Sequence, residues 1–502
     1  MQLLQIVSSL TSVQLRGGAL DGVEIASIAY DSRCVEPGAL FVALAGAHVD
    51  GLRFAPLAIA AGAVAVLCER APDDETVPYL VVPEARAAMA DAAVALYGDP
   101  SARLDVVGVT GTDGKTTTSF LVHALLRGTG HPTGLLSTVT ARIGAIDTPL
   151  PLHHTTPESG DLQRLLREMV DAGLTHAVVE TSSHALALER VRGCSFNAGI
   201  VTNITPEHLD FHRTMEEYRE AKARLLRVLD AGPAGSPVAI LNRDDPSFDL
   251  LRAASAAPVL SFGRGAEAMV RAVDEVVTAS GVSFRALTPA GAVGVRSPLT
   301  GAFNVMNLLA ALSLAVARGI DLQDAAAALE TMRDVPGRMQ KIAAGQPFNV
   351  VVDFAHTPDA LAKALDTLRA VTPPPGKLIA VFGAEGERDP RKRRPMGRAA
   401  AQRCDLVIVT TEDPRSEKPE DIASEIVSGA RDAGARENEN LFVVLDRTEA
   451  IAMAVASARP GDTVVLGGKG HEPFMHLDSG DIPWDEAQVA RDALAARGYT
   501  QT

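Results

Sequence analysis

The stretch Val106–Thr118 constrains the fold of this chain more than any other. It reads Val-Val-Gly-Val-Thr-Gly-Thr-Asp-Gly-Lys-Thr-Thr-Thr: an apolar run, a glycine-rich turn, and a lysine followed by hydroxyl side chains. Gly111 and Gly114 allow a tight turn whose backbone N–H groups face an anion, and a helix that begins there attracts negative charge. The stretch therefore predicts a strand, a phosphate-binding loop and the start of a helix.

The side chains after Gly114 indicate what such a loop can hold. Lys115 supplies a point charge that can reach terminal phosphates, and Thr116 supplies a hydroxyl for Mg²⁺. A strict P-loop has glycine where Val109 stands, so this loop is a shortened variant. The alternative is an ordinary strand-to-helix turn with a solvated lysine. Because strand, glycines, lysine and threonine occur in the required order, nucleotide binding is favoured.

Length and charge narrow the class of protein further. A chain of 502 residues corresponds to about three domains. The formal net charge of −15, with no long basic stripe, argues against nucleic acid as a partner, although a small anionic ligand needs only local positive charge. The sequence lacks an apolar run of the ~18 residues that cross a bilayer, so we expect no membrane insertion.

Cysteine usage points to a compartment. The cysteines at positions 34, 68, 194 and 404 lie far apart and form no C-x-x-C pair. This spacing favours neither a disulfide framework nor a zinc site, and it fits a reducing environment. Met1–Ile6 shows no basic start leading into an apolar run. We expect a cytoplasmic protein that acts as a monomer.

Alternating strand and helix patterns predict an α/β fold in three domains. Residues 1–102 indicate a small N-terminal α/β domain. Residues 103–335 begin with the phosphate loop and predict a P-loop-type, mostly parallel sheet with helices on both faces. Residues 336–502 show the most regular alternation and predict a C-terminal Rossmann-like α/β domain. Ligand groups are expected at the carboxyl ends of its strands.

The expected strands and helices follow from apolar runs and amphipathic segments. The strands are expected at Ile25–Tyr30, Leu40–Leu44, Ala63–Leu67, His176–Thr181, Asn197–Asn203, Phe348–Phe354, Lys377–Phe382, Asp405–Thr410, Leu441–Leu445 and Thr463–Leu466. The helices are expected at Gly160–Ala172, Met215–Leu229, Ala360–Val371 and Ala450–Ala458, with a long Ala/Leu helix ending near Gly319.

Three residues of the central domain carry candidate metal chemistry. Glu180 closes a predicted strand, where a carboxylate suits Mg²⁺, although the following serines also fit a helix N-cap. His208 follows another strand and is either a metal ligand or a capping histidine; H-E-x-x-H is absent, so a zincin is not indicated. Lys222 alone indicates a solvated lysine, and only a negatively charged form such as a carbamate could bind Mg²⁺.

The run Arg388–Arg394 is strongly basic. A nucleic-acid patch is one interpretation. At a strand end, a clamp for carboxylate or phosphate is at least as plausible, because arginine binds these groups in bidentate fashion.

These motifs, in this order, resemble the Mur ligase family of peptidoglycan synthesis over nearly the whole chain. The resemblance rests on Thr110–Thr117, Glu180–His184, Thr202-Asn203 with His208–Asp210, Tyr218–Lys222, Pro336–Met339, Asp353–Leu361 and Gly468–Glu472. Asp31-Ser32-Arg33 and Thr155-Thr156-Pro157 are similar to the branch that adds the third amino acid. Asp113 stands where many relatives have asparagine.

The resemblance implies an acid–amino-acid ligase with ATP and Mg²⁺ as cofactors. Its substrates would be UDP-MurNAc-L-Ala-D-Glu and a diamino acid. ATP-binding residues would be Gly111, Thr112, Asp113, Gly114, Lys115, Thr116, Thr117, Asn304, Asn307, Arg338 and Asp353. Metal ligands or their neighbours would be Thr116, Glu180, His208 and carbamylated Lys222, and the catalytic set Lys115, Glu180, His208 and Lys222. The UDP-substrate would be held by Ser32, Ala47, His48, Val49, Thr155, Thr156, Ser182 and Arg190.

The resemblance also implies where the amino acid binds. The residues are Arg388, Glu412, Asp413, Pro414, Arg415, Gly468 and Glu472. Relatives that add meso-diaminopimelate carry Asp-Asn-Pro-Arg where this chain has Glu-Asp-Pro-Arg. Arg415 could clamp a distal carboxylate, whereas the charge of Asp413 would attract an ammonium. L-Lysine or L-ornithine is therefore slightly favoured over meso-diaminopimelate.

Two other functions remain open from the sequence. A folylpolyglutamate synthase shares the nucleotide-binding core and the ligase chemistry but needs no first domain. A nucleotide-binding module without bond formation would not need the carboxylate, histidine and lysine beyond the loop.

Overall fold

The computed structural model describes residues 1–46, 49–70, 76–150, 155–231 and 235–500. The chain forms two compact units. One comprises Met1–Val273, Ala286–Val293 and Met306–Leu329; the other comprises Asp274–Arg285, Gly294–Val305 and Glu330–Thr502. The domain boundaries expected after residues 102 and 335 stay predictions.

The N-terminal sheet has the order β1-β5-β4-β3-β2, parallel except for the β1–β5 pair. Its strands are β1 (Gln14–Arg16), β2 (Ser27–Ala29), β3 (Ala39–Val42), β4 (Ala65–Cys68) and β5 (Tyr79–Val81). The helices are α1 (Leu3–Ser9), α2 (Ala55–Ala61) and α3 (Ala85–Tyr97), with short 3₁₀ turns η1 (Ser32–Cys34), η2 (Gly51–Phe54) and η3 (Pro100–Arg103). Alternate strand residues pack toward α1 and α3 on one face and α2 on the other.

The central sheet has the order β16-β15-β14-β13-β12-β11-β6-β10-β7-β8-β9 and is parallel from β14 to β7. Its strands are β6 (Asp105–Thr110), β7 (Thr133–Leu136), β8 (Ala141–Ile143), β9 (Ile146–Thr148), β10 (His176–Glu180), β11 (Ala198–Val201), β12 (Val238–Asn242), β13 (Val259–Gly263), β14 (Val270–Thr278), β15 (Gly281–Thr288) and β16 (Gly291–Ser297).

Helices accompany the central sheet. They are α4 (Lys115–Gly128), α5 (Ser159–Asp171), α6 (Ser183–Ala187), α7 (Leu209–His212), α8 (Met215–Arg227), α9 (Phe248–Ala254), α10 (Phe303–Arg318) and α11 (Leu322–Thr331). Leu162, Leu165 and Leu166 of α5 pack on one part of the core, while Leu226 of α8 and Leu251 of α9 pack on another. The central strand β6 is buried along its whole length, which explains its uninterrupted apolar character.

The C-terminal sheet has the order β17-β18-β22-β19-β20-β21 and is parallel except for β17. Its strands are β17 (Gln340–Lys341), β18 (Asn349–Asp353), β19 (Leu378–Phe382), β20 (Leu406–Val409), β21 (Leu441–Val443) and β22 (Thr463–Gly467). A hairpin of β23 (Phe474–Leu477) and β24 (Gly480–Pro483) follows. The helices are α12 (Pro358–Ala370), α13 (Arg393–Ala401), α14 (Pro419–Asp432), α15 (Arg447–Ser457) and α16 (Glu486–Ala496), with a 3₁₀ turn, η5, at Pro390–Lys392.

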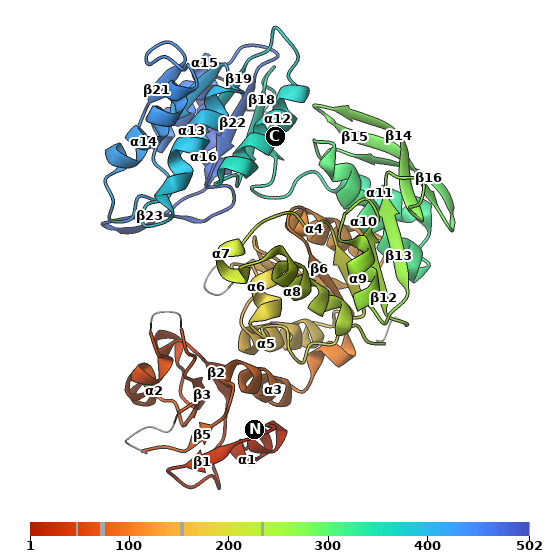
Figure 1. The fold of residues 1–502 in the computed structure, drawn as a ribbon, viewed down its shortest axis with the longest axis vertical. Helices are drawn as coiled ribbons and strands as arrows, with labels where there is room; N and C mark the ends of the chain where they lie inside the picture. Colours follow the sequence, from red (N-terminus) through yellow and green to blue (C-terminus); the bar gives the residue numbers. More distant parts are fainter. Residues whose placement is uncertain (47–48, 71–75, 151–154, 232–234, 501–502) are drawn as a thin grey trace. The chain divides into compact units, whose positions relative to one another are not determined.

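Side chains of this sheet alternate between two cores. Val351, Ala380 and Val465 pack with residues of α12, α13 and α14. Their chain neighbours Val352 and Val464 pack with residues of α15 and α16 on the other face. A strand buried on both faces needs apolar residues at every position, which is the pattern that predicted it. The predicted Rossmann-like α/β arrangement is confirmed (Figure 1).

The structure adds elements that the sequence did not predict. The hairpin strands β14, β15 and β16 widen the central sheet, and β8 and β9 extend its other edge. In β15 and β16 buried residues alternate with exposed ones, because only one face is covered, and this is a weaker signal than that of a strand buried on both faces.

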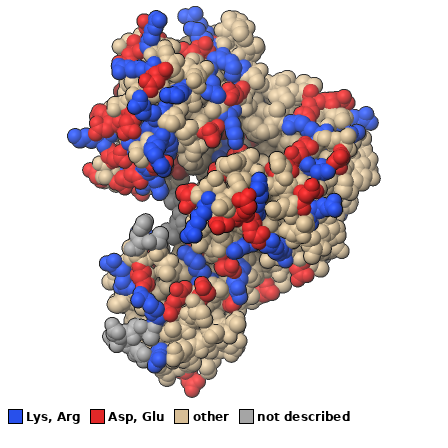
Figure 2. All heavy atoms as spheres, viewed as in Figure 1, with Lys and Arg blue, Asp and Glu red and all other residues tan. Residues whose placement is uncertain are grey.

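Two surface properties bear on partners. On the face in Figure 2, basic and acidic side chains are interspersed over the surface. Within the described ranges, no helix has both the length and the apolar character needed to cross a bilayer.

Two glycines allow α13 and α14 to pack backbone against backbone. A Cβ at Gly397 would lie 1.9 Å from the Ile426 carbonyl oxygen, and one at Gly429 would lie 1.9 Å from the Arg394 carbonyl oxygen. We predict that Gly397→Ala lowers the free energy of unfolding of the C-terminal domain by about 1–3 kcal/mol, because the helices must separate. Trp484 is the single tryptophan of the chain, so its fluorescence during denaturant unfolding reports on this domain.

The matched control is Gly294→Ala on β16, where an added Cβ meets nothing within 4 Å. It should change the same transition by less than about 0.5 kcal/mol. Equal effects of the two substitutions would disprove the close helix packing.

Candidate active site

The predicted phosphate loop joins β6 to α4. Gly111 has φ +150° and Gly114 has φ +82°. A Cβ at Gly111 would lie 1.8 Å from Thr202 Oγ1, and one at Gly114 would lie 2.4 Å from Asn307 Oδ1. Both the backbone conformation and the space therefore require glycine. The predicted order of strand, loop and helix is confirmed.

Neighbouring strands place polar groups beside this loop. Since β6 lies between β10 and β11, the carboxyl ends of all three strands meet at one edge. Asn203 accepts a hydrogen bond from Thr112 N at 2.8 Å through its carbonyl and from Asp113 N at 2.9 Å through Oδ1. Thr202 Oγ1 donates to the Asp113 carbonyl at 2.7 Å. Position 113 thus serves the loop through its backbone.

Glu180 ends β10 and is almost fully buried. Its carboxylate accepts hydrogen bonds from Thr116 Oγ1 at 2.9 Å, Thr138 N at 3.0 Å and Thr138 Oγ1 at 3.1 Å. These donors are neutral, so the three hydrogen bonds do not pair the carboxylate with a cation. The hydroxyl and carboxylate oxygens are the donors that Mg²⁺ prefers.

The donor set also indicates how Mg²⁺ would be held. Within the described part of the chain, no three His, Cys, Asp or Glu side chains are arranged to hold a metal ion. Mg²⁺ commonly uses one or two carboxylates and completes its shell with phosphate and water oxygens. Thr116 and Glu180 beside a phosphate loop fit that mode.

Two lysines approach the loop. Lys115 Nζ donates to the Thr112 carbonyl at 2.8 Å. Lys222, on α8, is buried; its Nζ donates to the Gly111 carbonyl at 2.6 Å and lies 4.5 Å from the centre of the Tyr218 ring. Burial, with a further contribution from Lys115, lowers the pKa of Lys222 well below its ordinary value. The solvated-lysine interpretation is wrong, because this side chain is buried.

His208 precedes α7 with φ +55°. Its ring lies 4.8 Å from that of His184, and its Nε2 lies 3.6 Å from the Glu207 carboxylate. Burial lowers the pKa of His208 in spite of Glu207, so the neutral, metal-binding form is favoured. Its side chain makes no capping hydrogen bond to α7, so the structure does not support the capping interpretation.

The residues expected at the muramoyl dipeptide gather next to Glu180. Thr156 Oγ1 donates to the Glu180 carbonyl at 2.8 Å and accepts from Ser182 N at 3.0 Å. Thr155 Oγ1 accepts a hydrogen bond from Thr138 Oγ1 at 3.1 Å. Ser182 caps α6 by accepting from Ala185 N, so the N-cap interpretation of these serines is confirmed for Ser182.

Arg190 joins this cluster through a residue that the sequence did not single out. Its guanidinium donates to the Thr156 carbonyl at 3.1 Å and pairs with Glu158 at 3.0 Å. Glu158 also pairs with Arg86 of α3 at 2.8 Å. The described structure gives Arg190 Nε no hydrogen-bond partner although it is buried, which leaves a donor for an anionic ligand.

The N-terminal candidates are less defined. Ser32 lies in η1, whose start is capped by Asp31, which accepts a hydrogen bond from Arg33 N. Val49 is exposed. Ala47 and His48 lie outside the described residues.

The adenosine-side candidates occur in both units. In the first, Asn307 Oδ1 accepts from Thr118 Oγ1 at 3.3 Å. In the second, Asn304 Nδ2 donates to the Thr300 carbonyl at 2.8 Å, and Asp353 accepts from Met339 N at 2.8 Å and Ala355 N at 3.0 Å. Arg338 lies over the Phe354 ring at 5.0 Å.

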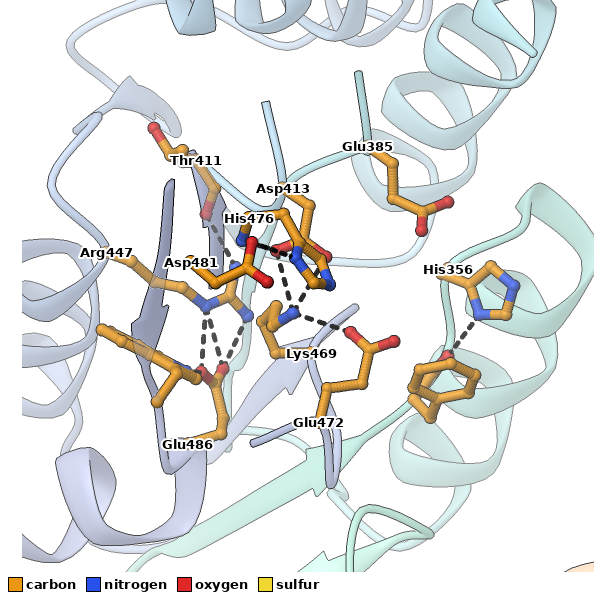
Figure 3. A network of polar contacts seen from close by, with 12 residues as sticks. His356, Glu385, Thr411, Asp413, Arg447, Lys469, Glu472, His476, Asp481 and Glu486 are labelled. Carbon is orange, nitrogen blue, oxygen red and sulfur yellow. Dashed lines mark hydrogen bonds and ion pairs between the residues drawn. The ribbon is translucent and has the colours of Figure 1, made fainter. Parts of the chain in front are cut away.

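The predicted amino-acid site is built on strand ends of the C-terminal sheet. Asp413, after β20, pairs through both carboxylate oxygens with Lys469 Nζ at 2.9 and 3.0 Å (Figure 3). Lys469, after β22, also pairs with Glu472 at 2.7 Å. Arg415 has φ +52°, and the described structure offers its buried Nε no hydrogen-bond partner.

Glu412 precedes Asp413 in the chain and is a further residue of the predicted amino-acid site. It is buried against Gly468, whose added Cβ would meet its Oε2 at 2.2 Å, and Oε2 has no hydrogen-bond partner in the described structure. Burial raises the pKa of Glu412 to about 8, although Arg447 acts in the opposite direction. The neutral acid is therefore favoured at pH 7.

A buried ion pair supports the same strand ends. Arg447 pairs with Glu486 at 2.6 Å and donates to the carbonyls of Thr411 at 3.1 Å and Gly467 at 2.8 Å (Figure 3). It thereby links the ends of β20 and β22. Sequence reasoning missed Arg447 and Glu486 because neither lies in a motif.

The basic run is mostly neutralised locally. Lys392 pairs with Glu385 at 3.1 Å and Arg393 with Glu417 at 2.8 Å, and Arg394 pairs with Asp432 at 2.9 Å. Arg388 is exposed. This pairing argues against a nucleic-acid patch.

Comparisons with known proteins cover the whole chain. The family models match in three places: the Mur ligase family catalytic domain at residues 24–104, the Mur ligase middle domain at 109–315, and the Mur ligase glutamate ligase domain at 337–470. The UDP-N-acetylmuramyl-tripeptide synthetase of Roseiflexus sp. (strain RS-1) is 48% identical over 490 residues, 95% of this chain and 96% of that protein.

Two further proteins are similar. The UDP-N-acetylmuramoyl-L-alanyl-D-glutamate–2,6-diaminopimelate ligase of Geobacillus kaustophilus (strain HTA426) is 41% identical over 500 residues, 99% of this chain and 100% of that protein. A solved structure of a ligase with the same name has a TM-score of 0.66 at 33% identity and covers 95% of this chain and 96% of its own.

Fold and site together define an ATP-dependent ligase that forms amide bonds. The chain belongs to the Mur ligase family, whose members act in the synthesis of peptidoglycan precursors.

The buried acid predicts a pH-dependent stability. Between pH ~4.5 and ~8 the folded protein holds a proton on Glu412 that the unfolded chain releases, so this group makes stability fall as pH rises through that window. The effect is on the order of 5 kcal/mol. We predict that Glu412→Gln removes it, so that the variant gains stability over wild type at pH 8.5 but not at pH 4.5.

Denaturant unfolding followed by Trp484 fluorescence at both pH values measures the difference. Exposed Glu439 provides the same chemical change in Glu439→Gln, which should leave the pH dependence unaltered. Parallel pH profiles for wild type and Glu412→Gln would contradict the assignment.

Proposed function

We propose that this chain joins a diamino acid to the D-glutamate of UDP-MurNAc-L-Ala-D-Glu by way of an acyl phosphate. One observation carries the proposal: the phosphate loop, the Thr116–Glu180 pair and buried Lys222 lie beside the Thr156–Arg190 cluster. A triphosphate and a carboxylate acceptor can therefore be bound next to each other. The similar proteins named for this reaction support the same acceptor.

In the first step, a carboxylate oxygen of the acceptor attacks the γ-phosphorus of ATP, and the bond from that phosphorus to the β–γ bridging oxygen breaks to release ADP. The backbone of Gly111–Gly114 and the ammonium of Lys115 hold the phosphates. Gly111, Thr112, Asp113, Gly114, Thr116 and Thr117 form the loop. Asn304, Asn307, Arg338 and Asp353 would bind the rest of the nucleotide. Positioning supplies much of the acceleration.

Mg²⁺ bound with the nucleotide supplies Lewis-acid stabilisation of the phosphate charge. Thr116 and Glu180 would hold it, with His208 and the carbamate of Lys222 as further ligands. The neutral amine of Lys222 is the form that reacts with carbon dioxide.

In the second step, the neutral amine of the amino acid attacks the acyl carbon, and phosphate leaves as the amide forms. The amine gives up one proton in this step, and the departing phosphate takes it up. Arg190 and Ser182, with Thr155 and Thr156, would hold the muramoyl dipeptide, since Arg190 keeps a buried donor available. Ser32, Ala47, His48 and Val49 would hold the uridine nucleotide in the N-terminal domain.

The identity of the diamino acid is the finer part of the proposal. Arg388, Arg415 and Glu472, with Glu412, Asp413, Pro414 and Gly468, form its site. The preference for L-lysine or L-ornithine over meso-diaminopimelate assumed a free carboxylate on Asp413. Lys469 neutralises that carboxylate. Glu472, whose side chain is 32% exposed, is therefore the carboxylate that can attract an ammonium group of the amino acid. Both classes remain candidates: Glu472 suits an ammonium, and the unpartnered Nε of Arg415 suits a distal carboxylate.

The rival functions are less well supported. Two relatives and a family model extend over the N-terminal domain, which a folylpolyglutamate synthase does not need. A binding module without catalysis would not need Lys115, Glu180, His208 and Lys222 around one loop. We also propose the domains 1–102, 103–335 and 336–502, a cytoplasmic location and a monomer.

Competition between amino acids tests the finer proposal. We expect ADP release that depends on magnesium, on UDP-MurNAc-L-Ala-D-Glu and on one of L-lysine, L-ornithine or meso-diaminopimelate. Mass spectrometry of the product from an equimolar mixture gives the preference. No ADP release with any of the three would reject the proposed function.

Removal of the buried amine tests the role of Lys222. We predict that Lys222→Ala loses at least about 100-fold in kcat and partly recovers with added short-chain carboxylates, which replace the carbamate oxygens. Lys363→Ala, on α12, is the control and should keep wild-type activity. Unchanged activity of Lys222→Ala would remove Lys222 from the site.

A further inference from the structure

Asp413, Lys469 and Glu472 form a group that we call the acid–lysine–acid group. The side chains of Asp413 and Lys469 are essentially fully buried, whereas that of Glu472 is partly exposed. The two ion pairs share one ammonium, at 2.9 Å from Asp413 and 2.7 Å from Glu472. Figure 3 shows Lys469 between the two carboxylates.

The carboxylate of Asp413 is fully engaged. Oδ1 accepts from Lys469 Nζ and from His476 N at 3.1 Å, and Oδ2 accepts from Lys469 Nζ at 3.0 Å. A ligand ammonium cannot reach it without displacing Lys469. Glu472 is the member of the group that a ligand can approach.

The backbone fixes the group in place. Glu472 N donates to the Lys469 carbonyl at 3.0 Å, which closes a tight turn between the two ion-paired residues. Arg415 N donates to the His476 carbonyl at 3.0 Å, so the loop after β20 is tied to β23 on the far side of Asp413. The three charges therefore keep their spacing.

The charges of the group sum to one negative charge, from two carboxylates and one ammonium. Buried charges act strongly on each other and on a nearby ligand because little water screens them. Removing the charge of Asp413 brings the group to zero, and removing that of Lys469 brings it to two negative charges. Removing both restores the original value.

We propose that Lys469 is a positioning residue of the amino-acid site. Its ammonium cancels the charge of Asp413 and holds the Glu472 carboxylate where it meets the ammonium group of the incoming amino acid. The net charge of the acid–lysine–acid group then sets the choice between a basic amino acid and one with a second carboxylate. This inference rests on the proposed function, because it concerns the amino acid of that reaction.

A charge cycle tests the inference with Asp413→Asn, Lys469→Gln and the double variant. Asp413→Asn should raise the KM of the accepted amino acid about tenfold, with kcat and the KM of ATP changed less than twofold, because the remaining ammonium compensates Glu472. The double variant should return to within about threefold of wild type, since the two introduced amides can hydrogen-bond to each other and the net charge is restored.

Selectivity gives a second readout that a purely structural role would not produce. The ratio of kcat/KM for L-lysine over meso-diaminopimelate should fall in Asp413→Asn and rise in Lys469→Gln, about fivefold each way. If one of the two amino acids binds but is not joined to the acceptor, its inhibition constant is measured and used in the comparison in place of kcat/KM. Shifts in the same direction for both variants would overturn the inference.

Controls separate folding and function from the inference. Asp432→Asn makes the same chemical change in an exposed ion pair with Arg394 and should leave all constants unchanged. If Lys469→Gln does not fold, the test rests on Asp413→Asn. An unchanged KM for the amino acid in that variant then rejects the inference. A wild-type protein without turnover rejects the proposed function instead, so the two failures are distinct.

Discussion

The site depends on how closely the phosphate loop approaches the strand beside it. Gly111 lies against Thr202 with no room for a side chain, and Asn203 holds the backbone at Thr112 and Asp113. This contact exists because β6 lies between β10 and β11 in a parallel sheet, whose strand ends converge. Glu180 and the turn at Thr202 are thereby brought to the loop from distant parts of the sequence.

Buried charged side chains also shape the structure, and their partners differ between the central and the C-terminal domain. In the central domain, the Glu180 carboxylate accepts hydrogen bonds from neutral donors and pairs with no cation among the described residues. In the C-terminal domain, Arg447 pairs with Glu486, and Lys469 pairs with Asp413. A buried pair gains little net stability over apolar residues, but losing one partner costs about 3–5 kcal/mol. Such pairs therefore hold the strand ends in one arrangement.

The sequence predicted the elements and site residues that depend on a local apolar pattern or on a motif. The buried strands β6, β10, β18, β19 and β22 were readable because both faces require apolar residues. Thr116 and Glu180 were found because they follow a glycine-rich turn and a strand. The sequence could not show that Lys222 is buried against Gly111 or that Lys469 neutralises Asp413, because both contacts join residues far apart in the chain. The exposed hairpins β14–β16 lacked a strong apolar signal.

The buried amine of Lys222 has a reactivity that the other side chains around the phosphate loop lack. Burial lowers the pKa of the Lys222 amine well below its ordinary value, and an uncharged amine can react reversibly with carbon dioxide without a dedicated enzyme. A carbamate formed on such an amine would rise and fall with the concentration of dissolved carbon dioxide.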